Sequence, residues 1–112
     1  MITTTQPVTF FPRGTAKISA TQTSGSASLF TQNGVGTNVM VYNAGPDIAY
    51  VKLGASGGSV TVPTTAGTGG TPVPVGFYGL TISRDANNDT TAYAICESGG
   101  TATLYFTVGN GT

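Results

Sequence analysis

Apolar and polar residues alternate along much of this chain with a period of two, which is typical of β-strands. The alternation is clearest in residues 37–54, where Val39 and Val41 precede the turn-forming run at residues 43–47 and a second alternating run covers residues 48–53. Two such runs around a Gly/Pro/Asn cluster predict a β-hairpin. Its expected inward residues are Val39, Val41, Ala49, Val51 and Leu53, and its expected outward residues include Tyr42, Tyr50 and Lys52.

The same pattern recurs elsewhere. Residues 90–97 and 101–108 alternate on either side of a Ser-Gly-Gly turn and predict a second hairpin. Shorter strands are expected at residues 8–11, 15–20, 26–30, 59–62 and 77–83. No window has a helical period, and the spacing of about ten residues between Gly-rich turns is typical of two packed sheets. We therefore predict an all-β fold, an antiparallel β-sandwich or jelly roll of about eight short strands.

The length of 112 residues predicts one domain, which we place at residues 15–112. Residues 1–14 are expected to form an extended N-terminal arm, because Pro7 and Pro12 enclose a short run and proline confines a strand to an edge or an arm. Phe10 and Phe11 are adjacent, so they point to opposite faces of a strand. Either a bulge buries both rings within the same chain, or the arm reaches onto a neighbouring subunit.

The low charge content indicates how the chain associates and does not bear on its fold. Charged residues make up 7 % of the chain, against roughly 25 % in typical domains, and the net charge is zero. Such a surface provides little electrostatic repulsion against association. This fits a subunit of a larger assembly, and the alternative is a neutral, hydroxyl-rich secreted β-protein. The chain has no basic stripe and no apolar run of about 20 residues, so we expect neither nucleic acid nor membrane as partner.

The residue types favour a protein without catalysis. Histidine is absent, which removes Ser-His-Asp and Cys-His chemistry and the commonest metal ligand. Cys96 lies among alanines and is interpreted as a small buried hydrophobe. Asp85, Asn87 and Asp89 match the start of a calcium loop, but the glycine at its sixth position is missing and Cys96 stands in place of the glutamate, so we favour a solvated turn. The Gly-rich residues 64–71 lack the lysine of a phosphate loop. We expect no enzyme activity, cofactor or metal.

Four segments follow a pattern of strand, Asn-x-Gly turn, Ala-Tyr-Val strand, proline-containing connection and closing Gly-Thr-Ala strand that ends in glycines. They are residues 39–45 (VMVYNAG), 49–54 (AYVKLG), 72–76 (PVPVG) and 100–111 (GTATLYFTVGNG). In this pattern, over residues 37–111, the chain resembles a class of small virion proteins of tailed bacteriophages. The resemblance implies a small β-sandwich or jelly roll that decorates or cements a capsid, with relatives in style at the neck, tail or fibre. It carries no catalytic motif.

From these observations we expect a capsid decoration (cement) protein, a homo-oligomer (dimer or trimer) on the capsid exterior that binds between subunits of the major capsid protein. Binding only to the assembled shell would stabilise that shell by mass action. The expected contact residues are Phe10, Phe11 and Arg13, in an arm that could add a strand to a capsid edge, together with Tyr50 and Lys52. The alternatives are a neck, tail or fibre subunit, and a host-surface or glycan-binding module that uses residues 64–71 and 85–89.

Overall fold

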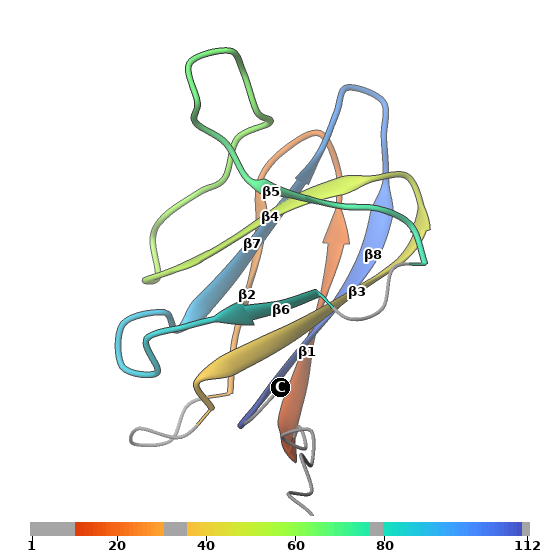
Figure 1. Cartoon of the computed structure of the whole chain (residues 1–112). Helices are drawn as coiled ribbons and strands as arrows, with labels where there is room; N and C mark the ends of the chain where they lie inside the picture. Colours follow the sequence, from red (N-terminus) through yellow and green to blue (C-terminus); the bar gives the residue numbers. More distant parts are fainter. Residues whose placement is uncertain (1–10, 31–35, 77–79, 111–112) are drawn as a thin grey trace, which may run out of the picture.

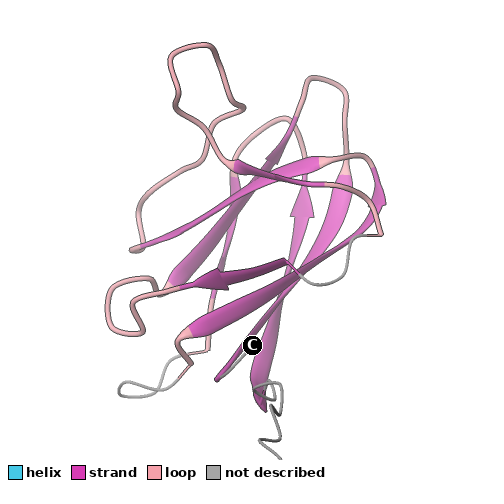
Figure 2. Cartoon of the chain, viewed as in Figure 1, coloured by secondary structure: helices cyan, strands magenta, loops and turns pink. Residues whose placement is uncertain are grey.

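The computed structural model describes residues 11–30, 36–76 and 80–110, which contain β-strands and no helix (Figures 1 and 2). The strands are β1 (Phe11–Ala20), β2 (Gly25–Ser28), β3 (Asn38–Pro46), β4 (Ala49–Gly54), β5 (Thr71–Val73), β6 (Leu80–Ser83), β7 (Thr91–Cys96) and β8 (Ala102–Asn110). These eight strands match the predicted number. No helix in the described ranges is long and apolar enough to cross a membrane.

The strands pair from the outside of the sequence inward. β1 pairs with β8, β2 with β7, β3 with β6 and β4 with β5, and every pair is antiparallel. Two further pairings, β3 with β8 and β4 with β7, join them into two four-stranded sheets. Sheet A has the order β1-β8-β3-β6 and sheet B the order β2-β7-β4-β5. This is the strand order of a jelly roll, so the predicted fold class is confirmed.

The core lies between the two sheets and follows the predicted alternation. β3 contributes Val39 and Val41, and β8 contributes Leu104 and Phe106, all fully buried. Sheet B faces them with Ala49 and Val51 of β4 and with Ala92, Ala94 and Cys96 of β7. Leu53 is half-buried and packs against this cluster. The inward face predicted from the sequence is therefore confirmed.

Both predicted hairpins are wrong. β3 lies in sheet A and β4 in sheet B, and β7 and β8 are likewise in different sheets. The two strands of each predicted hairpin therefore lie in opposite sheets. Two strands that face one core show the same alternation whether they lie side by side or in opposite layers, so the period of two does not distinguish these arrangements.

A buried asparagine holds the corner where the chain crosses from β3 to β4. The side-chain amide of Asn43 donates to the carbonyl oxygens of Asp47 and Val73, at 2.9 Å each. Its Oδ1 accepts a hydrogen bond of 2.7 Å from the backbone N–H of Gly45. The turn residues thus anchor an inter-sheet corner, with a cis peptide at Gly45–Pro46, and do not close a hairpin. A buried amide whose bonding capacity is used this fully stabilises the crossing.

One further strand prediction is wrong, and the division into an N-terminal arm and a domain stays a prediction. Residues 59–62 form no strand and belong to the irregular connection between β4 and β5. The part of the predicted arm that falls in the described ranges, from Phe11 to Gly14, lies in β1, where Phe11 is opposite Asn110 and the register shifts between Pro12 and Gly14. Residues 1–10, including most of the strand predicted at 8–11, lie outside the described residues, as do 77–79 of the strand predicted at 77–83.

Candidate functional site

The outer face of sheet B, called the covered face below, is covered in part by the chain itself. Tyr50, Tyr93 and Ile95 point away from the core on this face, and the connection of residues 55–70 packs Val60 and Val62 against them. Tyr93 is only 3 % exposed and Ile95 only 9 %. Figure 1 shows this connection in green, on the side of β4, β5 and β7. The covered face is therefore a second, smaller hydrophobic core.

Hydrogen bonds fix the connection to the covered face. The hydroxyl of Tyr93 donates to the carbonyl oxygen of Ala55 and accepts a bond of 2.9 Å from the N–H of Gly58. The N–H of Val60 donates to Oγ of Ser24 at 3.0 Å. Because a buried tyrosine hydroxyl needs partners, Tyr93 both fills the small core and orients the segment above it.

The outer face of sheet A, called the open face, is different, because no described segment crosses it. Cross-strand neighbours form rows that run over β1, β8 and β3, and two of these rows continue to β6. The open face is defined by the three rows that start at Thr15, Lys17 and Ser19, and its residues are Thr15, Lys17, Ser19, Met40, Tyr42, Thr81, Thr103, Tyr105 and Thr107. The β1 side chains are exposed and the others are half-buried. This face presents aromatic, thioether and hydroxyl groups to its surroundings.

Two contacts order the middle of the open face. The rings of Tyr42 and Tyr105 stack with their centroids 6.4 Å apart and an angle of 20° between the ring planes. The hydroxyls of Thr15 and Thr107 are within hydrogen-bonding distance, at 3.0 Å. Lys17 lies beside Tyr105 in the neighbouring strand and is the only charged residue among the side chains of this face. The open face therefore combines a central aromatic pair with one positive charge and no acidic group.

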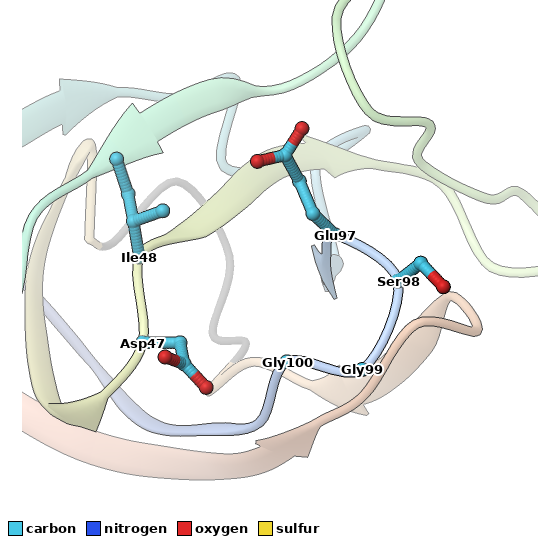
Figure 3. A pocket seen from close by; sticks show the side chains of 6 residues that line it. All are labelled: Asp47, Ile48, Glu97, Ser98, Gly99 and Gly100. Atoms are coloured by element: carbon cyan, nitrogen blue, oxygen red, sulfur yellow. The ribbon is translucent and has the colours of Figure 1, made fainter.

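A shallow pocket lies at the end of the sandwich, between the β3–β4 corner and the β7–β8 turn (Figure 3). It has a volume of about 240 Å³ and is lined by two acidic residues, Asp47 and Glu97, together with Ile48 and the turn residues 98–100. Oδ2 of Asp47 accepts a hydrogen bond of 2.9 Å from the N–H of Thr101. Figure 3 shows the two carboxylates on opposite sides of the pocket, pointing in different directions. They do not form an acid–base pair.

Arg84 is buried as a structural group at the other end of the sandwich. Its Nη2 donates to the carbonyl oxygen of Phe30 at 2.8 Å, its Nη1 to that of Asp89 at 3.1 Å, and its Nε to that of Gly36. Burial lowers the pKa of Arg84, and the negative charge of Asp89 opposes this shift. Arginine stays charged even so, because its ordinary pKa is very high. The guanidinium thus ties together three chain segments, a role that sequence reasoning did not identify.

The acidic turn uses its own carboxylates. Oδ1 of Asp85 accepts from the N–H of Asn87 at 3.0 Å, and its Oδ2 accepts from the side-chain amide of Asn88 at 2.6 Å. Oδ2 of Asp89 accepts from the N–H of Asp85 at 2.9 Å. The bond from Asn87, and after it the bond from Asn88, lowers the pKa of Asp85. The carboxylates therefore accept hydrogen bonds from groups of the same turn. No group of three potential metal-ligating side chains occurs among the described residues.

Cys96 is free and buried, as predicted. It is 1 % exposed and belongs to the main core. Burial raises the pKa of the thiol, and the negative charge of Asp47 raises it further. A protonated, enclosed thiol is a poor nucleophile, so Cys96 acts as a packing residue.

Among the described residues predicted to contact a partner, Arg13 lies on sheet A, whereas Tyr50 and Lys52 lie on sheet B. Arg13 is exposed at the bulge of β1, where its Nε donates to Oδ1 of Asn110 at 3.4 Å. Tyr50 and Lys52 are on sheet B: Tyr50 packs into the covered face, and Lys52 is exposed beside a hollow formed with residues 59–61 and 68–69. Phe10 and the side chain of Phe11 lie outside the described residues.

Sequence reasoning missed the open face as a unit. Alternation did place Tyr42 and Tyr105 on outward positions, but it paired β3 with β4 and β7 with β8. The two tyrosines meet only because β3 and β8 are neighbours. A search for apolar residues at outward positions of separate strands would have found Met40, Tyr42 and Tyr105 without showing that they are adjacent.

Comparison with known proteins adds no relative: no protein-family model, curated protein or solved structure matches this chain.

Proposed function

We propose that this chain is a structural protein of a bacteriophage virion, of the capsid decoration (cement) type. In this proposal it binds between subunits of the major capsid protein on the exterior of the head and stabilises the shell. The observation that carries the proposal is the open face, where rows of aromatic, thioether and hydroxyl side chains lie side by side, whereas described residues of the chain pack over part of the outer face of sheet B. The segments that resemble phage virion proteins and the charge content of 7 % support the same role.

The composition of the open face suits a protein partner. Tyrosine and methionine are enriched in protein–protein interfaces, and acidic side chains are depleted at their centres. The pair of Tyr42 and Tyr105 lies in the middle rows, and threonines surround it on β1, β8 and β6. Binding energy concentrates in central aromatic residues inside such a rim. We therefore assign the two tyrosines as the anchors of the contact.

Lys17 defines the chemistry expected on the partner. It is exposed, and the described open face holds no carboxylate for it. A partner that places an aspartate or glutamate opposite Lys17 gains charge complementarity, which improves specificity and the association rate more than the affinity. The expected partner surface is apolar and hydroxyl-rich with one acidic group opposite Lys17.

The size of the open face implies that binding depends on many copies. Four strands about 4.8 Å apart, over about five residues each, span on the order of 350 Å². A standard interface buries about 800 Å² on each partner, so one open face alone gives a weak contact. A capsid presents a repeated array of sites, and linked copies of the protein gain effective concentration on it. Weak single contacts are therefore compatible with firm decoration.

The test uses empty shells of the virus that encodes this chain, prepared without the protein. The full chain should co-sediment with the shells and raise their disruption temperature. Replacing Tyr42 and Tyr105 together by Ser should abolish binding, and Lys17→Glu should weaken it about ten-fold. Lys52→Glu is the matched control, since Lys52 is the exposed lysine of sheet B.

The outcomes separate the possibilities. Loss of binding with Lys52→Glu and not with Lys17→Glu would move the contact from the open face to sheet B. Binding to isolated tails and not to shells would favour the neck, tail or fibre role. Retention on a glycan array without binding to either particle would contradict the virion proposal as a whole.

A further inference from the structure

The edges of the two sheets differ in how well they are protected against pairing with another chain. Exposed edge strands are usually short or carry proline, because their unpaired N–H and C=O groups can bind a further strand. β2 has four residues, β5 has three and contains Pro72, and β6 is four residues long in the described part. β1 has ten residues, and only β8 pairs with it within the described ranges. The start of β1 carries Pro12 and a register shift, but residues 15–20 form a regular stretch without proline that is longer than any of the other three edge strands in the described part.

From this difference we propose that two copies of the chain pair through the free edges of their β1 strands, antiparallel and around a two-fold axis. Identical strands that run antiparallel satisfy two-fold symmetry without further adjustment, and two-fold dimers are the commonest oligomers. The pairing would continue sheet A of one copy into sheet A of the second copy. This inference concerns the chain alone and does not rest on the proposed virion role.

The regular part of β1 contains one charged residue, Lys17, and these two features select one register for the pairing of the two copies. The strand pairs continuously with β8 only from Gly14 to Ala20, because the register shifts between Pro12 and Gly14. Registers that use the start of β1 are disfavoured by this shift and by Pro12, and the usable edge is residues 15–20.

Within this usable edge, the face to which each side chain points and the charge of Lys17 determine the register of the pairing. Opposite residues in an antiparallel pair share a face, so the axis must pass through a residue and not between two. An axis at Lys17 would place two lysines opposite each other, which is unfavourable. An axis at Ile18 pairs residues 16–20 with residues 20–16 of the second copy. It places each Lys17 opposite Ser19 of the second copy on the open face.

Sheet B is also compatible with a two-fold axis through Ile18. Gly25, at the start of β2, lies close to Ile18: a Cβ built on it would be 3.4 Å from Cγ2 of the isoleucine. An axis through Ile18 therefore brings the two β2 edges toward each other as well. The β2 sequence GSAS has neither charge nor proline, so it offers no obstacle to this approach.

The test introduces either a negative or a positive charge at position 19, and the two substitutions should change the dimer constant in opposite directions. Ser19 is exposed, so its variants should fold like the wild type. In sedimentation equilibrium of the full chain up to about 0.5 mM, the wild type should show a monomer–dimer equilibrium. In the dimer each Glu of Ser19→Glu is opposite one Lys17 of the second copy, so two such pairs form and the variant should tighten the dimer about ten-fold, whereas Ser19→Lys should weaken it about ten-fold.

Thr81→Glu and Thr81→Lys are the matched controls, because Thr81 is on the same face in β6, three strands from β1. They should leave the dimer constant unchanged. Circular dichroism verifies that every variant is folded. A wild type that stays monomeric over the whole concentration range overturns the proposal. A dimer that responds equally to both Ser19 variants, or as strongly to those of Thr81, overturns the β1 interface.

Discussion

The two outer faces of this jelly roll differ in whether a described segment of the chain packs over their outward tyrosines. Each belongs to a four-stranded antiparallel sheet, and each carries two tyrosines at outward positions. On sheet B residues 60 and 62 of the connection pack against Tyr50 and Tyr93, and Tyr93 is buried while Tyr50 is half-buried. On sheet A the half-buried Tyr42 and Tyr105 stack on each other. The same residue type at the same period therefore belongs to a small hydrophobic core on one face and to a stacked pair on the other.

This difference explains why β7 is buried along its whole length. Ala92, Ala94 and Cys96 face the main core, and Tyr93 and Ile95 face the small core under the connection. A strand that is covered on both sides reads as a continuous apolar run, as a central strand of a parallel sheet does. In β8 burial alternates residue by residue from Ala102 to Val108. Burial along a strand thus records the number of layers around it.

The largest effect is expected from Tyr93→Ala on the covered face. The substitution removes a buried ring and both hydrogen bonds to the connection, so the free energy of unfolding should fall by about 3–5 kcal/mol. Tyr93→Phe keeps the ring and should cost about 1–3 kcal/mol, because it leaves the N–H of Gly58 without its tyrosine acceptor. Urea unfolding followed by circular dichroism measures both. A cost below 1 kcal/mol for the alanine variant would show that the cover contributes nothing to stability.

A smaller effect is expected where the cover approaches sheet B most closely. A Cβ added to Gly70 would lie 2.8 Å from Cγ2 of Val60 and 2.9 Å from the backbone N of Val51. Gly70→Ala should therefore push the connection off the sheet and cost about 1–3 kcal/mol. Gly54→Ala is the control, because its added methyl would meet only Tyr93, at 3.7 Å. The comparison is measured by thermal unfolding, and equal costs for the two variants would contradict the steric explanation.

On the open face, Tyr105→Ala should cost only about 1 kcal/mol of stability, since it removes one half-buried ring and its stacking on Tyr42. Its effect on partner binding should be much larger than its effect on folding. Unfolding curves of Tyr105→Ala and Tyr93→Ala, recorded side by side, test this directly. If both variants lost equal stability, the two faces would not differ in role.

The smallest effect concerns the core shared by the two faces. Burial raises the pKa of Cys96, so the folded state holds the thiol proton more tightly than the unfolded chain does. The contribution is fully present below the thiol's ordinary pKa and is lost as the pH rises through the raised value. The stability difference between wild type and Cys96→Ala should therefore shift against the wild type at alkaline pH. A difference that stays constant from neutral to alkaline pH would contradict this assignment.

Alternation predicted the strands and their inward residues well, because burial of one face imposes it on the sequence. It could not predict sheet membership: the Asn43 corner and the Ser98–Gly100 turn have hairpin-like sequences, yet both cross between layers. The cover was missed for a related reason, since Val60 and Val62 alternate like a strand but have no strand partner. The run Ala92–Cys96, apolar at every position, was the one sequence signal of a second layer.

The open face could be predicted only in part. Its outward tyrosines are visible in the sequence, but their contact depends on β3 and β8 being neighbours. The expected contact residues Tyr50 and Lys52 are both outward on sheet B, where Tyr50 packs against the connection and Lys52 is exposed. Which strands are neighbours is a long-range property, and no local pattern encodes it.

Pairing of the first strand with the last has a practical consequence for protein engineering. Phe11 is opposite Asn110, so the chain enters and leaves the sandwich side by side at one end. Figure 1 shows the connections β1–β2, β3–β4 and β7–β8 at the other end. A cargo fused ahead of β1 or behind β8 would therefore project from the same pole, whereas a peptide grafted at Gly67, which has no neighbouring atom within 4 Å of an added Cβ, would be displayed elsewhere. The fold thus offers two separate positions for display on one small scaffold.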